Sequence, residues 1–185
     1  MKKPLIALTL DYENSKEYSQ YPWYAIRENY FTSIEDTGGI GVGIPHNIKD
    51  IISLLQKIDG LVITGGNFDI NPNMFGENNI HKTVKLKENR TNFELLAAEI
   101  MLKNNKPVLG ICRGMQIMGV HDGAELMKID GHIKTRHQLK IKDAHVGLLP
   151  ESVNSYHNFT LNKCPDTYEI LAESEDGCIE AMKHK

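Results

Sequence analysis

Lys106-Pro-Val-Leu-Gly-Ile-Cys-Arg-Gly-Met-Gln-Ile-Met-Gly119 is typical of a buried strand, a sharp turn that carries one cysteine, and the start of a helix. Gly110 and Gly114 allow the backbone to bend tightly at Cys112 without a Cβ clash, so we expect the thiol to project above the strand ends. The first amide groups of the following helix would then face the sulfur and favour thiolate over thiol. The stretch therefore predicts a nucleophile elbow at Cys112.

Around this stretch, apolar runs alternate with segments of helical periodicity, as in a mostly parallel α/β sheet covered by helices on both faces. Strands are expected at 4–10, 40–44 and 60–64, and helices at 24–36, 47–58 and 89–103, with Asn47 as the cap of the second helix. The polar loop at 67–87 is long enough to suggest a functional role. Beyond residue 120 the pattern is weaker, and short strands are expected at 139–141, 152–155, 169–172 and 178–182.

Composition limits the class of protein. With 185 residues, 41% apolar and 24% charged, the chain is expected to form one domain over residues 1–185. A net charge of −3 and a pI near 6.2 provide no basic surface for nucleic acid. Because the sequence contains neither a signal peptide pattern nor an apolar run that could span a bilayer, we expect a soluble, cytoplasmic protein without a membrane partner.

The cysteines and histidines show no metal-ligand spacing in the sequence. Cys112, Cys164 and Cys178 are odd in number and unpaired in spacing, and the eight histidines are scattered. We therefore expect neither a disulfide scaffold nor a metal site, and most histidines are expected to be surface or hydrogen-bonded residues.

Four segments in a fixed order resemble one family. They are Gly60-Leu-Val-Ile-Thr-Gly-Gly-Asn-Phe-Asp-Ile-Asn-Pro72, Phe75-Gly-Glu77, Gly110-Ile-Cys-Arg-Gly-Met-Gln116 and Val153-Asn-Ser-Tyr-His157. Together they resemble the class I glutamine amidotransferase superfamily, and within it the γ-glutamyl hydrolase branch typified by γ-glutamyl-γ-aminobutyrate hydrolase. The compact length is also similar to that of γ-glutamyl-CDP-amidate hydrolases of capsule biosynthesis. The resemblance implies a flavodoxin-like open sheet with its site at the carboxyl ends of the strands.

The resemblance also implies a reaction without a cofactor. Cys112 would attack the carbonyl of a small-molecule γ-glutamyl amide, giving a glutamyl thioester that water hydrolyses to glutamate, with release of an amine or amidate. The backbone N–H groups of Gly66 and Arg113 would form the oxyanion hole. Four side chains would bind the glutamyl part of the substrate: Gln116, Ser155, Tyr156 and His157.

Other interpretations of the same residues stay open. The alternative is that Cys112 is only a small buried side chain and His157 only a hydrogen-bonded turn residue. Arg90 and Glu94 are most simply a surface ion pair worth a few tenths of a kcal/mol, although Arg90 could border the site. The alternative functions are a glutaminase subunit that delivers ammonia to a synthase partner, and a vestigial ligand-binding homologue. The assembly expected is a homodimer or a complex with such a synthase.

The general base and the leaving group are less well defined. The family places its histidine and glutamate in a Trp-His-Pro-Glu-like motif after the segment that corresponds here to 176–182, and the sequence shows no such motif up to Lys185. The preferred explanation is that the chain lacks this C-terminal segment; a substitute histidine, with His157 first, and a pseudoenzyme are the alternatives. The leaving group would be recognised by the 67–87 loop and by the 11–23 stretch, whose aromatic residues are Tyr12, Tyr18, Tyr21 and Trp23.

Overall fold

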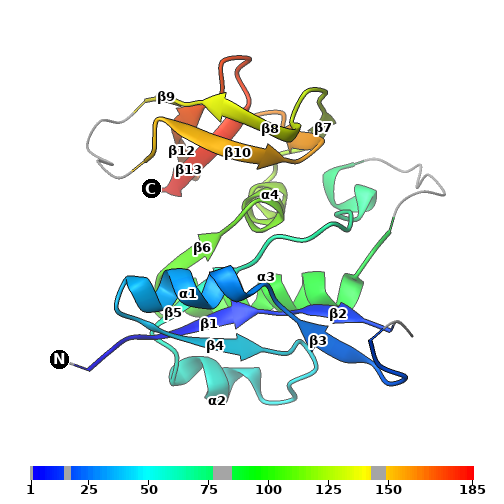
Figure 1. Ribbon diagram of the computed structural model, residues 1–185, viewed down its shortest axis with the longest axis vertical. Helices are drawn as coiled ribbons and strands as arrows, with labels where there is room; N and C mark the ends of the chain where they lie inside the picture. Colours follow the sequence, from blue (N-terminus) through cyan, green and yellow to red (C-terminus); the bar gives the residue numbers. More distant parts are fainter. Residues whose placement is uncertain (1, 15–17, 77–84, 143–148) are drawn as a thin grey trace. The chain divides into compact units, whose positions relative to one another are not determined.

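The computed structural model describes residues 2–14, 18–76, 85–142 and 149–185 (Figure 1). These residues form two compact units. The first unit is drawn from residues 1–70 and 81–117, and the second from residues 71–80 and 118–185. The single domain expected over residues 1–185 therefore stays a prediction. Glu77, part of one of the four family-like segments, lies outside the described residues.

The first unit is built on a parallel sheet in the order β4-β1-β5-β6. Its strands are β1 (Leu5–Thr9), β4 (Ile40–Ile44), β5 (Gly60–Ile63) and β6 (Val108–Gly110). Every residue of β5 is buried, as is usual for a parallel strand covered on both faces. These strands confirm the expected open α/β sheet and the three strands predicted before the elbow.

Helices cover both faces of this sheet. They are α1 (Glu28–Asp36), α2 (Ile51–Gln56) and α3 (Glu88–Lys103), and α4 (Arg113–His121) follows β6. A Cβ placed on Gly41 would lie 2.8 Å from Phe31 of α1 and 3.2 Å from Leu8, so α1 packs closely on the face that carries Leu8. Thr9, on the opposite face, donates a hydrogen bond of 2.8 Å to Glu94 of α3. The two helices therefore lie on opposite sides of the sheet.

Two predicted helices begin later than expected. Residues 24–25 belong to β3 (Trp23–Ala25), which pairs antiparallel with β2 (Asp11–Glu13), so the helix predicted from residue 24 begins only at Glu28. The helix predicted from residue 47 begins at Ile51 because Asp50, and not Asn47, caps it. The Asp50 carboxylate accepts from the Ser53 N–H at 3.0 Å.

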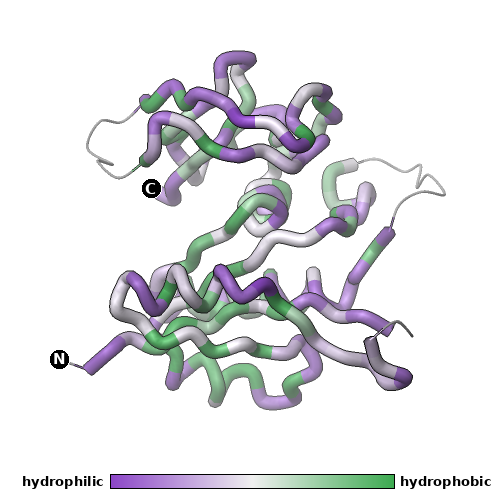
Figure 2. The backbone as a smooth tube through the Cα atoms, in the orientation of Figure 1, coloured by the Kyte–Doolittle hydropathy of each residue, from purple (hydrophilic) through white to green (hydrophobic). Residues whose placement is uncertain are grey.

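The second unit contains antiparallel strand pairs and the short 3₁₀ helix Pro72–Phe75. β8 (Ile133–Gln138) pairs with β10 (Ser152–Tyr156), and β7 (Leu126–Lys128) pairs with β11 (Phe159–Leu161). β12 (Tyr168–Glu173) lies between β9 (Lys140–Ile141) and β13 (Ile179–His184). The four short strands predicted here are confirmed, whereas β7, β8 and β11 were not predicted. Figure 2 shows why: the strands of this unit mix hydrophilic and hydrophobic residues.

Among the described helices, none has the length and apolar character that crossing a bilayer requires.

Candidate active site

Cys112 occupies a strained turn between β6 and α4. Its φ of 54° lies in the left-handed region, which costs a residue with a Cβ about 1–2 kcal/mol relative to an ordinary conformation. The side chain is exposed. An exposed sulfur on a strained strand-to-helix turn is the geometry of a nucleophile elbow, so the structure confirms the elbow expected at Cys112.

The two flanking glycines have the role expected of them, because a Cβ at either position would clash. The bend itself falls on Cys112, and Gly110 and Gly114 are needed because other backbone passes close to them. A Cβ on Gly110 would lie 2.6 Å from the carbonyl carbon of Gly114, and a Cβ on Gly114 would overlap the carbonyl oxygen of Ile63. Ile111 also donates its N–H to that oxygen at 2.9 Å. The glycines therefore allow the elbow to pack directly on the end of β5.

The start of α4 provides backbone donors beside the sulfur. The Gln116 N–H donates to the Cys112 carbonyl at 3.1 Å, so Gln116 lies one turn beyond the elbow, as expected. Arg113 is the first residue of α4, and the first N–H groups of an α-helix have no acceptor within the helix. This position is suited to the oxyanion role expected for the Arg113 N–H.

The glycine pair after β5 lies next to Cys112. A Cβ on Gly65 would lie 3.6 Å from the Cys112 Cβ, and the Gly65 N–H donates to the Tyr30 hydroxyl at 3.0 Å. A Cβ on Gly66 would lie 2.5 Å from the Phe68 ring. The loop is thus held against the elbow and leaves no room for a larger residue at position 66.

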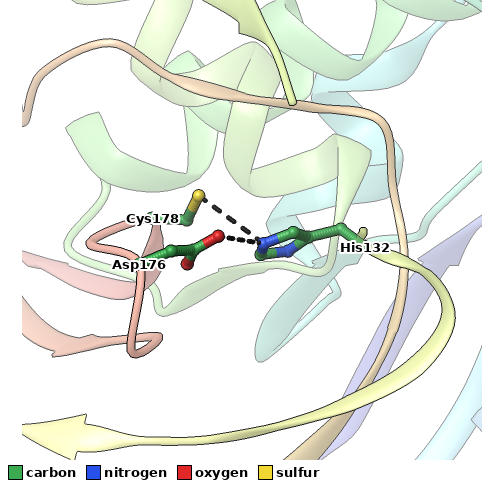
Figure 3. A group of neighbouring side chains, drawn as sticks. All are labelled: His132, Asp176 and Cys178. Atoms are coloured by element: carbon green, nitrogen blue, oxygen red, sulfur yellow. Dashed lines mark hydrogen bonds and ion pairs between the residues drawn. The ribbon is translucent and has the colours of Figure 1, made fainter. Parts of the chain in front are cut away.

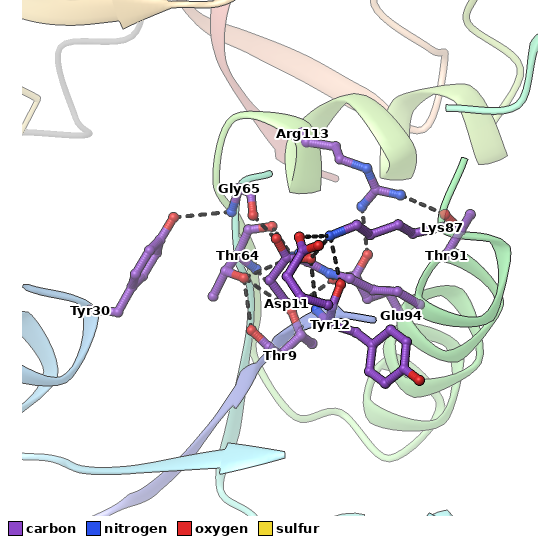
Figure 4. Close-up of polar contacts among 12 residues, drawn as sticks. Thr9, Asp11, Tyr12, Tyr30, Thr64, Gly65, Lys87, Thr91, Glu94 and Arg113 are labelled. Atoms are coloured by element: carbon purple, nitrogen blue, oxygen red, sulfur yellow. Dashed lines mark hydrogen bonds and ion pairs between the residues drawn. The ribbon is translucent and has the colours of Figure 1, made fainter. Parts of the chain in front are cut away.

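A buried network of charges holds this loop and the elbow together (Figure 4). Arg90 and Glu94 are both 0% exposed and are joined by a 2.8 Å bond. The Arg90 guanidinium also donates to the carbonyl oxygens of Thr64 and Gly65, each at 3.0 Å. The expected surface ion pair is therefore wrong. Arg90 and Glu94 lie on the face of α3 that packs against the sheet, and there they hold the backbone that leads into the glycine loop.

The side chain of Arg113 joins the same network. It donates to Glu94 and to the hydroxyl of Thr91, both at 2.6 Å, and its guanidinium lies 3.9 Å from the centre of the Phe68 ring. Burial lowers the pKa of Arg113 from its ordinary value, although the neighbouring Glu94 carboxylate acts in the opposite direction. The side chain behind the elbow is thus fixed by two hydrogen bonds and a cation–π contact.

Asp11 and Lys87 extend the network toward the surface. The Lys87 ammonium donates to Asp11 at 2.8 Å and to Glu13 at 2.6 Å, and Asp11 also lies 3.1 Å from the Arg90 guanidinium. Burial alone would raise the pKa of Asp11, but the hydrogen bonds from Lys87 and Tyr12 and the charge of Arg90 hold it below its ordinary value. Three cations thus face three carboxylates, which allows the partly buried groups to stay ionised.

This network was the main feature of the site missing from the sequence prediction. The pattern of α3 contains the clue, because Arg90 and Glu94 continue the same helical stripe as the buried Ala97, Ala98 and Met101. Charged residues on an apolar stripe indicate buried, mutually paired groups, not a solvated face.

The other three predicted substrate-binding residues belong to the second unit. Ser155 is 2% exposed and donates its hydroxyl to the His132 carbonyl at 2.7 Å, whereas Tyr156 is 66% exposed. The Nδ1 atom of His157 lies 2.9 Å from the Phe159 carbonyl oxygen. Burial alone would lower the pKa of His157, but the Glu180 carboxylate raises it above its ordinary value. Their role in substrate binding stays a prediction.

The predicted aromatic stretch divides into two groups. Tyr18 and Tyr21 are exposed, and the Tyr18 ring lies 5.4 Å from that of Trp23. Tyr12 instead packs with Tyr24 and His46, with ring centres 5.0–5.2 Å apart. These three rings line a cleft of about 530 Å³ in the first unit, together with residues at the starts of α2 and α3. Of the four aromatic residues named from the sequence, Tyr12 is the one that lines this cleft.

Comparisons with known proteins agree with this geometry. The chain is 38% identical over 130 residues to the glutamine amidotransferase-like protein RP404 of Rickettsia prowazekii, a match that covers 69% of this chain and 46% of that protein. It is 30% identical over 196 residues to the YvdE protein of Lactococcus lactis, a match that covers 93% of this chain and 81% of that protein. It is 23% identical over 209 residues to a γ-glutamyl-γ-aminobutyrate hydrolase of Escherichia coli O157:H7, a match that covers 98% of this chain and 80% of that protein.

Solved structures show the same fold. A glutamine amidotransferase of Thermotoga maritima matches 100% of this chain and 73% of its own, with a TM-score of 0.67 at 14% identity. A glutamine amidotransferase of Methylobacillus flagellatus matches 99% of this chain and 66% of its own, with a TM-score of 0.62 at 15% identity. These neighbours confirm the flavodoxin-like, class I glutamine amidotransferase type of fold. A family model also matches residues 4–185, and with the cysteine elbow and its glycine loop it shows that the chain belongs to the Peptidase C26 family.

Proposed function

We propose that this chain is a cysteine-dependent γ-glutamyl amide hydrolase with Cys112 as its nucleophile. The observation that carries the proposal is the exposed Cys112 sulfur on a strained elbow, directly beside the Gly65-Gly66 loop. The C26 family membership and the distant similarity to γ-glutamyl-γ-aminobutyrate hydrolases support a hydrolase of this type.

In the proposed reaction, the Cys112 thiolate forms a bond to the δ-carbonyl carbon of the γ-glutamyl group. The carbonyl electrons move to oxygen, and the N–H groups of Arg113 and Gly66 stabilise the resulting oxyanion. Collapse of this intermediate breaks the C–N bond, and the leaving amine takes up the proton that the Cys112 thiol lost on becoming the thiolate. Water then adds to the glutamyl thioester and breaks the C–S bond, which releases glutamate and restores the thiol. Gln116 would bind the α-amino or α-carboxyl end of the glutamyl group.

The buried network supports this reaction by fixing positions. Arg90 binds the backbone before Gly66. The side chain of Arg113, the residue that follows Cys112, is anchored by Glu94, which also bonds to Arg90. Oxyanion stabilisation depends on donors that need no rearrangement during the reaction. The network would therefore act by keeping the two proposed donors at a constant separation.

The proposal is tested by hydrolysis and by trapping. The purified chain is given glutamine and several γ-glutamyl amides, including γ-glutamyl-γ-aminobutyrate, and free glutamate is measured. An electrophilic glutamine analogue is then added, and the modified cysteine is located by mass spectrometry. We expect glutamate release from γ-glutamyl amides and a single adduct on Cys112, with both lost in Cys112→Ala and retained in Cys164→Ala.

The other two thiols provide an internal comparison. Burial raises the pKa of the Cys164 and Cys178 thiols, so both should react slowly with iodoacetamide at neutral pH. Labelling of Cys112 no faster than that of Cys164 would overturn the proposal. Activity with glutamine alone, raised by a synthase, would instead favour ammonia delivery. A CDP-amidate substrate, a role in the capsule and a vestigial site stay predictions.

A further inference from the structure

The second unit contains a cluster of metal-ligating side chains centred on His132 (Figure 3). The ring is 1% exposed and has a carboxylate near each nitrogen. Its Nε2 atom lies 2.8 Å from Asp176 Oδ2, and its Nδ1 atom lies 3.6 Å from Glu180 Oε1. On the other side of Glu180, the same Oε1 atom lies 3.6 Å from His157 Nε2. Two imidazoles therefore converge on one carboxylate oxygen.

Hydrogen bonds on the outer side of the two rings assign their protons. An ionised carboxylate only accepts, so His132 Nε2 donates to Asp176, and the neutral form of the ring would have its lone pair at Nδ1. The Phe159 carbonyl also only accepts, so His157 Nδ1 donates to it, and in the neutral ring Nε2 carries the lone pair. With both rings neutral, three lone-pair atoms face one another, two imidazole nitrogens and one carboxylate oxygen, and either a proton on one ring or a metal ion satisfies them.

Burial makes this arrangement costly without a cation. His132 Nδ1 and Glu180 Oε1 are buried and have no hydrogen-bond partner among the described residues. A buried acceptor without a donor is destabilising, and more so when it is charged. The three ligand atoms lie within 4.8 Å of one another. A tetrahedral zinc ion with bonds of about 2.0–2.1 Å would hold its ligand atoms roughly 3.4 Å apart, close to the two 3.6 Å separations.

We propose that His132, His157 and Glu180 form a binding site for one divalent transition-metal ion, with zinc as the best fit. Two imidazoles and a carboxylate are a ligand set that zinc takes in proteins, whereas calcium and magnesium prefer oxygen alone. Asp176 orients His132 and the Phe159 carbonyl orients His157, as metal-bound histidines are usually held. Ser174 in turn donates to Asp176 at 2.6 Å.

The same histidine also faces a second set of ligand atoms, formed with Asp176 and Cys178. In that set His132 Nε2 already shares its proton with Asp176, and the Cys178 sulfur lies 3.8 Å away. The Glu180 set is preferred because His132 Nδ1 and Glu180 Oε1 have no hydrogen-bond partner among the described residues, while the Cys178 set is internally hydrogen-bonded.

A metal ion at this site would join strands of different sheets. His132 precedes β8, His157 lies between β10 and β11, and Glu180 belongs to β13. Because β8 and β10 already pair with each other, a single ion would crosslink their sheet to the separate sheet that contains β13. Coordination would also occupy His157 Nε2, so any glutamyl recognition by this segment would fall to Ser155 and Tyr156.

The test measures metal binding and not catalysis. The full chain, without an affinity tag, is titrated with zinc chloride against a chromophoric chelator, and then with cobalt chloride. We expect one ion per chain, a higher thermal unfolding midpoint with zinc, and a four-coordinate cobalt spectrum without a thiolate charge-transfer band. Asp176→Asn should weaken zinc binding about 10- to 100-fold by removing the orienting carboxylate, and Glu180→Gln should weaken it further.

Matched variants separate the outcomes. Cys178→Ser removes the competing thiol and should leave zinc affinity unchanged, and His157→Gln provides a second ligand variant if Glu180→Gln fails to fold. Circular dichroism with a chelator present checks that each variant retains the wild-type fold. Equal zinc affinity in the wild type and both ligand variants would overturn the proposal. Loss of binding in Cys178→Ser, with a thiolate band in the cobalt spectrum, would also overturn it.

Discussion

Arg90 and Glu94 form an ion pair on α3 in which neither side chain has any exposed surface. Glu94 is also bonded to Arg113 beside the elbow, and Arg90 to the carbonyl of Gly65. The Glu94 carboxylate therefore connects the helix that covers the sheet, the glycine loop and the residue after Cys112. The pair acts as a structural hub for the candidate active site.

Glu94→Gln should be strongly destabilising. The substitution removes the negative charge between two buried guanidinium groups, and breaking a buried ion pair from one side typically costs about 3–5 kcal/mol. For a chain of this size, that corresponds to a fall of roughly 6–20 °C in the unfolding midpoint. The measurement is urea and thermal unfolding of the variant and the wild type.

Glu99→Gln is the matched control, because Glu99 and Lys103 form another pair with the same spacing on the same helix. That pair is joined at 2.6 Å, but both side chains are more than half exposed. Its loss should change the free energy of unfolding by less than about 0.5 kcal/mol. Equal effects of the two substitutions would show that the buried pair has no special role.

Cys112→Gly and Cys112→Ala should differ in stability although both lack the proposed nucleophile. At a φ of 54°, alanine retains the left-handed strain and glycine does not, so the glycine variant should be the more stable by about 1 kcal/mol. Urea unfolding of the two variants measures the difference. If Cys112→Ala is equally or more stable, the elbow is not strained in solution.

The first unit could be predicted because its local patterns and its tertiary environment agree. Strands such as β5 are buried on both faces and therefore appear as apolar runs. The elbow was predictable because positions 110 and 114 have no room for a Cβ. Both positions are therefore glycine, and this pair of glycines is visible in the sequence. The fold and the position of Cys112 both followed from these features.

The second unit and the charged network were harder to predict. β8 has the sequence Ile-Lys-Thr-Arg-His-Gln and depends on pairing with β10, a partner that the sequence does not indicate. The spacing of Arg90 and Glu94 fits an exposed pair as well as a buried one. The side chains around His132 come from segments far apart in the sequence, so no local sequence motif indicates this cluster.

Gly66→Ala should lower kcat about 100- to 1,000-fold, with a much smaller effect on KM. The new Cβ would lie 2.5 Å from the buried Phe68 ring, so either the ring or the loop must move, and the proposed N–H donor at residue 66 would move with it. The expected magnitude is that of losing one oxyanion donor. Steady-state kinetics with a γ-glutamyl amide provide the measurement.

Gly76→Ala is a comparison for the general cost of adding a methyl group to a glycine. Gly76 has a φ of 84° and no atom within 4 Å of its ideal Cβ, so this variant carries backbone strain without a clash. It should lower stability but leave kcat close to that of the wild type. A similar loss of kcat in both variants would argue against a specific role for Gly66.

Acid should weaken the network through Asp11. The pKa of Asp11 is lower in the folded chain than its ordinary value of 3.8, so the folded state binds this proton less readily than the unfolded state does. The stabilisation by Asp11 is therefore complete above the ordinary pKa and is lost as the pH falls through the lower pKa of the folded state. Asp11→Asn removes this dependence and should be less stable than the wild type at neutral pH.

Urea unfolding across the acidic range compares the two proteins, and their stabilities should converge as the pH falls below 3.8 and through the lower pKa of Asp11 in the folded state. Lys87→Met removes one of the cations that favour the Asp11 carboxylate, so its curve should lie between those of the wild type and Asp11→Asn. Curves that run parallel at every pH would mean that Asp11 has the same pKa in the folded and unfolded chains. In that case its contacts with Lys87 and Arg90 would not persist in solution.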